Sequence, residues 1–304
     1  MKKDEMIRQI SELKKEKNAV LLAHNYARAE VQDIADIVGD SFALSQAAVS
    51  LDADMIVFAG VRFMAESAHI LSPQKTVLLP DADAGCPMAD MITADALRRA
   101  KEQYPNAAVV CYVNSSAAVK AHSDVCCTSA NAEEVVSALS EEEILFVPDK
   151  NLGHYVSTLT DKTVHLWDGF CPIHQQITKS DVLSAKAMYP NALFLAHPEC
   201  RPDVLEEADG IFSTAGIIKY AAASNHEEFI IGTEQEMMHK LRKDSPGKSF
   251  YPVSKYAYCS NMKMATLPSI LNALKTETTK ITVPEETRVR AKKALDRMLE
   301  AVPK

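Results

Sequence analysis

The feature that most constrains the fold of this 304-residue chain is a threefold internal repeat. Apolar runs at 19–23, 107–113 and 192–196 each reach a polar residue, and these residues (His24, Tyr112 and His197) serve as position zero. An aspartate then recurs at position 12 and a hydroxyl residue at position 17: Asp36, Asp124 and Asp209, then Ser41, Ser129 and Thr214. Another apolar run follows in each repeat, with no gap needed in the comparison. Matched offsets of this kind indicate one structural unit present three times.

Each repeat also has a cysteine, which lies at position 62 in the first and third repeats and at position 59 in the second. These are Cys86, Cys171 and Cys259, and a threonine that opens a helical pattern stands seven residues after each of them. A unit of about 85 residues is too long for a solenoid repeat and suits a small α/β subdomain.

The strands read as near-continuous apolar runs that alternate with helical stretches. This pattern is typical of parallel sheets covered on both faces and joined by right-handed crossovers. We therefore expect an α/β fold of three homologous three-layer αβα subdomains, with parallel sheets, around a pseudo-threefold axis. The predicted repeats span 1–88, 89–173 and 174–284, and a C-terminal helix over 285–304 is expected to pack back on the first.

Composition excludes several classes of protein. A net charge of −8 argues against a nucleic-acid partner, which requires a basic face. The apolar runs are too short to span a membrane, and the charged N-terminus lacks the apolar region of a signal peptide. The sequence thus predicts a cytoplasmic protein. The seven cysteines are an odd number and form no CxxC pair, which argues against a disulfide framework.

The candidate site residues follow the predicted strands. Ligands of parallel α/β sheets bind beyond the carboxyl ends of the strands, where polar residues stand in all three repeats. These are His24, Tyr26, Tyr112, Asn114, His197 and Glu199, together with the position-17 hydroxyls Ser41, Ser129 and Thr214. A hydroxyl at a helix start can be a simple cap, but three at one offset favour anion binding. Glu199 is a candidate general acid or base beside His197 and Tyr26.

The cysteines divide into two groups. Cys86, Cys171 and Cys259 lie at equivalent loops, and three thiolates meeting on one axis suit either zinc or a [4Fe–4S] cluster. A cluster held by three cysteines leaves one iron open as a Lewis acid. His174 follows Cys171 by three residues and is either a fourth ligand or a substrate contact. The other cysteines are predicted to be small buried hydrophobes: Cys111, Cys126, Cys127 and Cys200.

Motifs along nearly the whole chain closely resemble the quinolinate synthase A family. They are HNYARAEVQDIADIVGDS at 24–41, DAGCPMADM at 83–91, YVNSSAAVKAHSDVCCTSAN at 112–131, DGFCPIH at 168–174, HPEC at 197–200 and CSNMKMATL at 259–267. The resemblance implies three αβα subdomains around a pseudo-threefold axis and a [4Fe–4S] cluster. It also implies condensation of iminoaspartate with dihydroxyacetone phosphate to quinolinate, with loss of phosphate and water, in de novo NAD biosynthesis.

The resemblance further implies a role for each candidate residue. Cys86, Cys171 and Cys259 would hold the cluster. Tyr26, Glu199, His24 and His197 would be catalytic, with Tyr26 and Glu199 moving protons. The position-17 hydroxyls and both histidines would anchor carboxylate or phosphate oxygens. Tyr112 and Asn114 would position the substrate, and His174 would line the same pocket. L-aspartate oxidase is a transient partner by analogy, and Ser213 stands beside Thr214 as an alternative hydroxyl.

Two other classes of function stay open at this point. One is a zinc hydrolase or lyase that uses the three cysteines and His174. The other is an anion-binding or sensor protein without catalytic activity.

Overall fold

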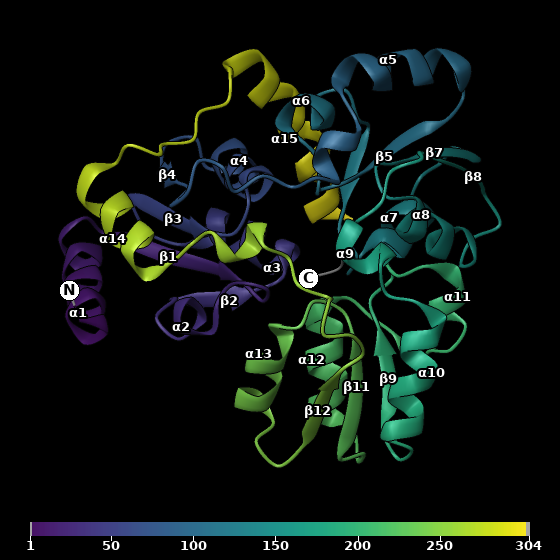
Figure 1. Ribbon diagram of the computed structural model, residues 1–304. Coiled ribbons are helices and arrows are strands. Elements are labelled where there is room, and N and C mark those ends of the chain that lie inside the picture. Colours follow the sequence, from purple (N-terminus) through teal and green to yellow (C-terminus); the bar gives the residue numbers. More distant parts are fainter. Residues whose placement is uncertain (1, 302–304) are drawn as a thin grey trace.

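The computed structural model describes residues 2–301, which form three lobes around a central region (Figure 1). Each lobe holds a four-stranded sheet, and the three sheets share one strand order: β2-β1-β3-β4, β6-β5-β7-β8 and β10-β9-β11-β12. Every pair of neighbouring strands within these sheets is parallel. The predicted α/β class with three αβα subdomains is confirmed.

The same succession of elements builds each lobe. The first contains α1 (Lys3–Glu16), β1 (Ala19–His24), α2 (Ala29–Gln32), β2 (Ile37–Gly39), α3 (Ser41–Ser50), β3 (Met55–Ala59), α4 (Arg62–Leu71) and β4 (Thr76–Leu78). The second contains α5 (Ala94–Gln103), β5 (Ala108–Tyr112), α6 (Ala117–Lys120), β6 (Val125–Cys127), α7 (Ala132–Ser137), β7 (Glu143–Val147), α8 (Lys150–Ser157) and β8 (Thr163–Leu166). The third contains α10 (Lys179–Met188), β9 (Leu193–Ala196), α11 (Pro202–Leu205), β10 (Gly210–Ile211), α12 (Thr214–Ala223), β11 (Glu228–Gly232), α13 (Met237–Asp244) and β12 (Ser249–Pro252).

The remaining elements lie between or after the lobes. They are the 3₁₀ helix η1 (Ala89–Met91), α9 (Pro172–Gln175), the 3₁₀ helix η2 (Asn261–Lys263), α14 (Leu267–Thr276) and α15 (Glu285–Glu300).

The recurring aspartate at position 12 links two neighbouring strands through hydrogen bonds. In the first lobe the Leu21 amide donates to Asp36 Oδ2 at 2.7 Å, and the Asp36 amide donates to the Leu21 carbonyl at 2.9 Å. The same pair of bonds joins Asp124 to Val109 and Asp209 to Phe194. The aspartate therefore fixes the start of the edge strand against the first strand, which is a structural role rather than a site role.

Three threonine-capped helices link the lobes in a cycle. Thr93, Thr178 and Thr266 each accept a bond from the amide three residues on, at the starts of α5, α10 and α14. Helices α5 and α10 pack against the lobe that follows them, whereas α14 returns to α1 and β3 of the first lobe. Leu271 and Leu274 of α14 share a buried core with Ile10 and Leu21. Helix α14 thus lies within the predicted third range, 174–284, but packs on the first lobe.

The last helix bridges two lobes. Helix α15 packs against α4 of the first lobe and against α6 and β6 of the second, and its buried face carries Ala291, Ala294, Leu295 and Met298. The helix therefore contacts the second lobe as well as the first, on which the sequence predicts it to pack. Positions 302–304 of that expected helix fall outside the described residues. The repeat boundaries stay a prediction. Within 2–301, we find no helix with the length and apolarity needed to cross a bilayer.

Candidate active site

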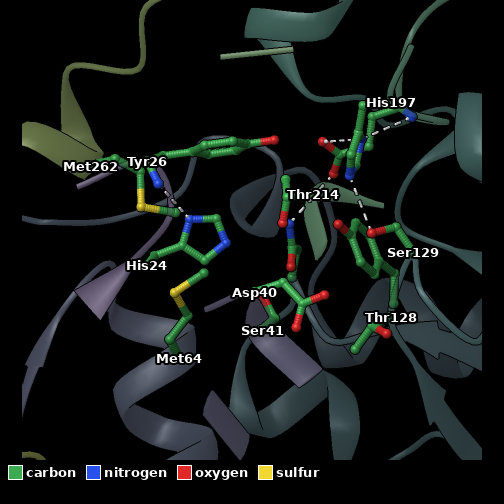
Figure 2. A pocket seen from close by; sticks show the side chains of 13 residues that line it. His24, Tyr26, Asp40, Ser41, Met64, Thr128, Ser129, His197, Thr214 and Met262 are labelled. Atoms are coloured by element: carbon green, nitrogen blue, oxygen red, sulfur yellow. Dashed lines mark hydrogen bonds and ion pairs between the residues drawn. The ribbon is translucent and has the colours of Figure 1, made fainter. Parts of the chain in front are cut away.

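Nine predicted site residues line one small cavity of about 40 Å³ where the three lobes meet (Figure 2). We call it the anion cavity. Each lobe supplies three of them: His24, Tyr26 and Ser41 from the first, Tyr112, Asn114 and Ser129 from the second, and His197, Glu199 and Thr214 from the third. They meet because each stands at or just beyond the carboxyl end of a parallel strand, and these ends face the centre of the molecule.

The position-17 hydroxyls do not act as helix caps. Asp40, one residue before Ser41, caps α3 by accepting from the Ala43 amide at 2.9 Å. In the third lobe, Ser213 caps α12 by accepting from the Gly216 amide. Capping by the preceding residue leaves Ser41 and Thr214 to line the anion cavity, whereas Ser213 lines a neighbouring hollow. Asp40 and Thr128 also line the cavity and were not among the predicted residues.

The two position-zero histidines are neutral hydrogen-bond donors. His24 Nδ1 accepts from the Tyr26 amide at 3.1 Å, and His197 Nδ1 accepts from the Glu199 amide at 3.3 Å. Burial lowers the pKa of each ring to about 3. Since Nδ1 accepts and the ring is neutral, the proton is on Nε2. His197 Nε2 lies 3.1 Å from Ser129 Oγ, which joins the second and third lobes.

Glu199 is a buried carboxylate held by His174. Burial opposes its ionisation, but its Oε2 lies 2.8 Å from His174 Nδ1, and this contact lowers the pKa of the Glu199 carboxyl. Burial and the nearby Glu199 charge raise the pKa of Tyr26 and Tyr112 well above the ordinary value, so both remain phenols. The site therefore combines one proton acceptor with two proton donors.

A second cavity, of about 190 Å³, contains the three matched cysteines. We call it the cysteine cavity. Cys86, Cys171 and Cys259 line it together with His174. It shares Tyr26, Asn114 and Glu199 with the anion cavity, so the two spaces adjoin. His174 lines the cysteine cavity rather than the anion cavity. The other four cysteines are fully buried, as predicted.

Buried carboxylates support two of the cysteine loops. Asp149 Oδ2 accepts from the Cys171 amide at 3.1 Å, and Glu234 Oε1 accepts from the Cys259 amide at the same distance. Asp149 and Glu234 both stand at position 37, where the first repeat has Val61. The sequence analysis missed these residues, although acids at a matched offset in two repeats were a usable signal.

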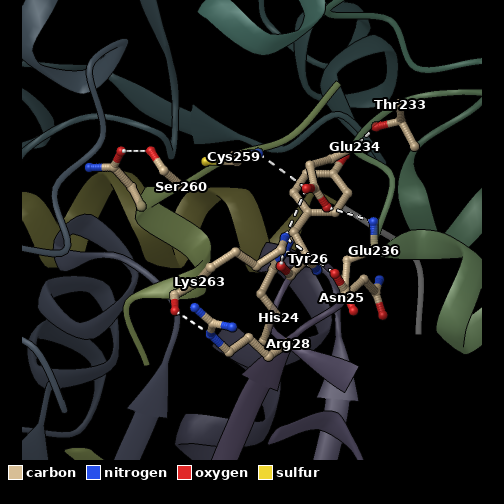
Figure 3. A network of polar contacts seen from close by, with 12 residues as sticks. His24, Asn25, Tyr26, Arg28, Thr233, Glu234, Glu236, Cys259, Ser260 and Lys263 are labelled. Carbon is tan, nitrogen blue, oxygen red and sulfur yellow. Dashed lines mark hydrogen bonds and ion pairs between the residues drawn. The ribbon is translucent and has the colours of Figure 1, made fainter. Parts of the chain in front are cut away.

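Lys263 connects the third cysteine loop to the first lobe (Figure 3). Its ammonium is buried, lies 2.8 Å from Glu234 Oε1 and also donates to the Tyr26 carbonyl. In return, Arg28 Nε donates to the Lys263 carbonyl at 2.6 Å. This pairing holds Tyr26 and the Cys259 loop in a fixed relation. Sequence spacing gave no sign of the link to the first lobe, because Lys263 lies more than 200 residues from both Tyr26 and Arg28.

The sequence also matches a known protein family along most of its length. The family described as "Quinolinate synthetase A protein" matches residues 8–300. The chain belongs to this family. The resemblance seen in the motifs is thereby confirmed, and the chain is an enzyme.

Several similar proteins bear the name quinolinate synthase. "Quinolinate synthase 2" of Methanosarcina acetivorans is 59% identical over 291 residues, covering 96% of this chain and 94% of that protein. "Quinolinate synthase" of Geotalea uraniireducens is 54% identical over 304 residues and covers 100% of both chains. The protein of the same name from Thermodesulfovibrio yellowstonii is 52% identical over 294 residues, covering 96% of this chain and 97% of its own.

Proposed function

We propose that this enzyme is a quinolinate synthase of de novo NAD biosynthesis. It would condense iminoaspartate with dihydroxyacetone phosphate and release phosphate and water. The names of its relatives support this activity. The observation that carries the proposal is the junction of the two cavities at Glu199 and Tyr26, where a space lined by neutral hydrogen-bond donors meets three cysteines.

The cysteine cavity fits a [4Fe–4S] cluster held by Cys86, Cys171 and Cys259. One free cysteine comes from each of three equivalent loops. Burial raises the pKa of Cys86 to about 12 and also raises the pKa of Cys171 and Cys259, so a cationic centre is needed to keep them as thiolates. When bound, such a cluster supplies an open iron as a Lewis acid for a substrate oxygen.

The anion cavity suits the acidic substrates because it presents neutral donors. The Nε2–H groups of His24 and His197 and the hydroxyls of Ser41, Ser129 and Thr214 would bind carboxylate and phosphate oxygens. Donors fixed by the fold pay little reorganisation energy as charge shifts during reaction. This local arrangement compensates for the net charge of −8, which repels anions at long range.

Proton transfer falls to the residues at the junction. The ionised Glu199 would accept a proton during isomerisation of the condensed substrate, and Tyr26 would donate one to a departing hydroxyl. Asn114 lines both cavities and would hold the substrate between them, with Tyr112 beside it. A cytoplasmic location, and transient contact with L-aspartate oxidase as the source of the imine, belong to the same proposal.

The decisive experiment is anaerobic purification followed by iron and sulfide analysis, a visible spectrum and a quinolinate assay. We expect about four iron and four sulfide per chain, lost together with activity in Cys86→Ser, Cys171→Ser or Cys259→Ser. Cys200→Ala is the matched control, because this buried thiol lies outside the cysteine cavity. Stoichiometric zinc, with no iron and sulfide taken up after a chelator removes it, would favour the hydrolase or lyase, and anion binding without turnover would favour the sensor.

A further inference from the structure

Three metal-binding side chains meet at the junction in a set that differs from the three cysteines. Donor atoms of Cys171, His174 and Glu199 all lie within 4.8 Å of one another. Cys171 is the residue before α9 and His174 lies within that helix, so the two form a local Cys-x-x-His pair. Glu199 follows β9 of the third lobe. Thiolate, imidazole and carboxylate are the donors that zinc takes in proteins.

Two of the three residues, His174 and Cys171, are held in place by further hydrogen bonds. His174 Nε2 lies 2.8 Å from Thr233 Oγ1, which leaves Nδ1 directed at Glu199 Oε2. The backbone of Cys171 is held by Asp149, which has no exposed surface. Supporting contacts of this kind orient metal ligands and are worth tenfold or more in affinity.

Charge and burial also suit a divalent cation. His174 and Glu199 are almost fully buried, and His174 Nδ1 makes no hydrogen bond of good geometry despite its short approach to Glu199. On cation binding the Cys171 thiol releases its proton, and the thiolate and the Glu199 carboxylate together carry two negative charges, which a cation of charge two neutralises. Burial of two such charges without a counter-ion is costly, so the cation allows both groups to be charged.

We propose that the cluster-free protein binds one zinc-type divalent cation through Cys171, His174 and Glu199. Because Cys171 is also a cluster ligand in the proposed function, the cation and the cluster exclude one another. Zinc would then hold the enzyme in an inactive form that resists cluster assembly until it is removed. The inference rests on the proposed function only for that second, competitive part.

The test uses Co²⁺ as a spectroscopic probe and Zn²⁺ as a competitor, added to metal-stripped protein without oxygen. We expect about one equivalent of Co²⁺ to give a thiolate charge-transfer band, which Zn²⁺ abolishes. The Cys86→Ser/Cys259→Ser double variant should bind as the unaltered chain does. His174→Asn and Glu199→Gln should each weaken binding at least about tenfold.

Folding is checked in the same samples. Zn²⁺ should raise the unfolding temperature of the double variant and raise that of Glu199→Gln by clearly less, since stabilisation by a cation grows with its affinity for the fold. Loss of binding in the double variant, with retention in His174→Asn, would place the cation on the three cysteines and overturn the proposal. Absence of stoichiometric binding would overturn it as well.

The double variant separates this inference from the proposed function, because it cannot hold a three-cysteine cluster in either case. For the unaltered chain, prior loading with Zn²⁺ should block reconstitution with ferrous iron and sulfide, and a chelator should restore it. Reconstitution at the same rate with Zn²⁺ in place would overturn the competitive part.

Discussion

At the scale of single residues, the proposed anion site presents neutral hydrogen-bond donors. His24 and His197 are buried, each accepts a backbone amide at Nδ1, and each therefore presents an Nε2–H to the cavity. A protonated imidazole would attract an anion more strongly but would be costly to bury. Neutral donors fixed in position give directionality without that cost.

The buried histidines predict a loss of stability in mild acid. Their folded pKa of about 3 lies below the ordinary value of 6.5, so below pH 6.5 the unfolded chain takes up protons that the folded chain does not. The free energy of unfolding should therefore fall as pH drops from 6.5 towards 3, by about 1.4 kcal/mol per pH unit for each histidine. Urea denaturation at stepwise pH measures the slope. His24→Gln should reduce the slope, whereas replacing the exposed His226 with Gln should leave it unchanged.

Substitution of Glu199 should abolish most of the activity and leave the fold intact. Glu199→Gln keeps the side-chain shape but removes the proton acceptor, so quinolinate formation should fall by about 10²-fold or more. Iron content and unfolding temperature should stay close to those of the unaltered chain. Glu227→Gln, an exposed position, is the control and should retain full activity. Full activity of Glu199→Gln would remove Glu199 from the mechanism.

At the scale of elements, two repeated positions have different purposes. The aspartate at position 12 bonds the backbone of the first strand in every lobe, whereas the hydroxyl at position 17 lines the anion cavity. Both recur equally well in the sequence. Recurrence therefore marks a position as part of the unit but does not say whether it serves folding or binding.

Substitution of a position-12 aspartate should lower the stability of the fold. Asp209→Ala leaves the Phe194 amide without its carboxylate acceptor and should lower the free energy of unfolding by about 1.5–3 kcal/mol. Asp209→Asn, which keeps an acceptor oxygen, should lose less. Urea denaturation measures both, with the exposed Asp161→Ala as a control expected within about 0.5 kcal/mol. An equal loss in the alanine and asparagine variants would contradict this account.

At the scale of the molecule, the site exists only where the lobes meet. Asn25 Nδ2 donates to Thr214 Oγ1 at 3.0 Å, and Tyr26 OH bonds Thr233 Oγ1 at 2.5 Å, both between the first and third lobes. The Lys263–Glu234 pair lies at the same junction. The contacts that fix the relative placement of the lobes therefore also fix the geometry of the site.

Lys263 should accordingly be important for stability. Lys263→Met leaves the Glu234 carboxylate buried without its partner, which costs about 3–5 kcal/mol. Glu234→Gln in the same chain removes the orphaned charge and should recover part of the loss. The unfolding midpoints of the single and double variants measure this coupling, with exposed Lys293→Met as the control. A double variant no more stable than Lys263→Met would show that the pair is not coupled.

The sequence by itself determined the lobes and the residues at their strand ends. Apolar runs and matched offsets act over short distances along the chain, so they fix each parallel sheet and the polar residues beyond it. The tertiary structure alone decided the return of α14 to the first lobe, the place of His174 in the cysteine cavity and the Lys263–Glu234 pair. The return of α14 joins residues from opposite ends of the chain, and the other two contacts depend on how the loops beyond the strands are oriented, which no local pattern records.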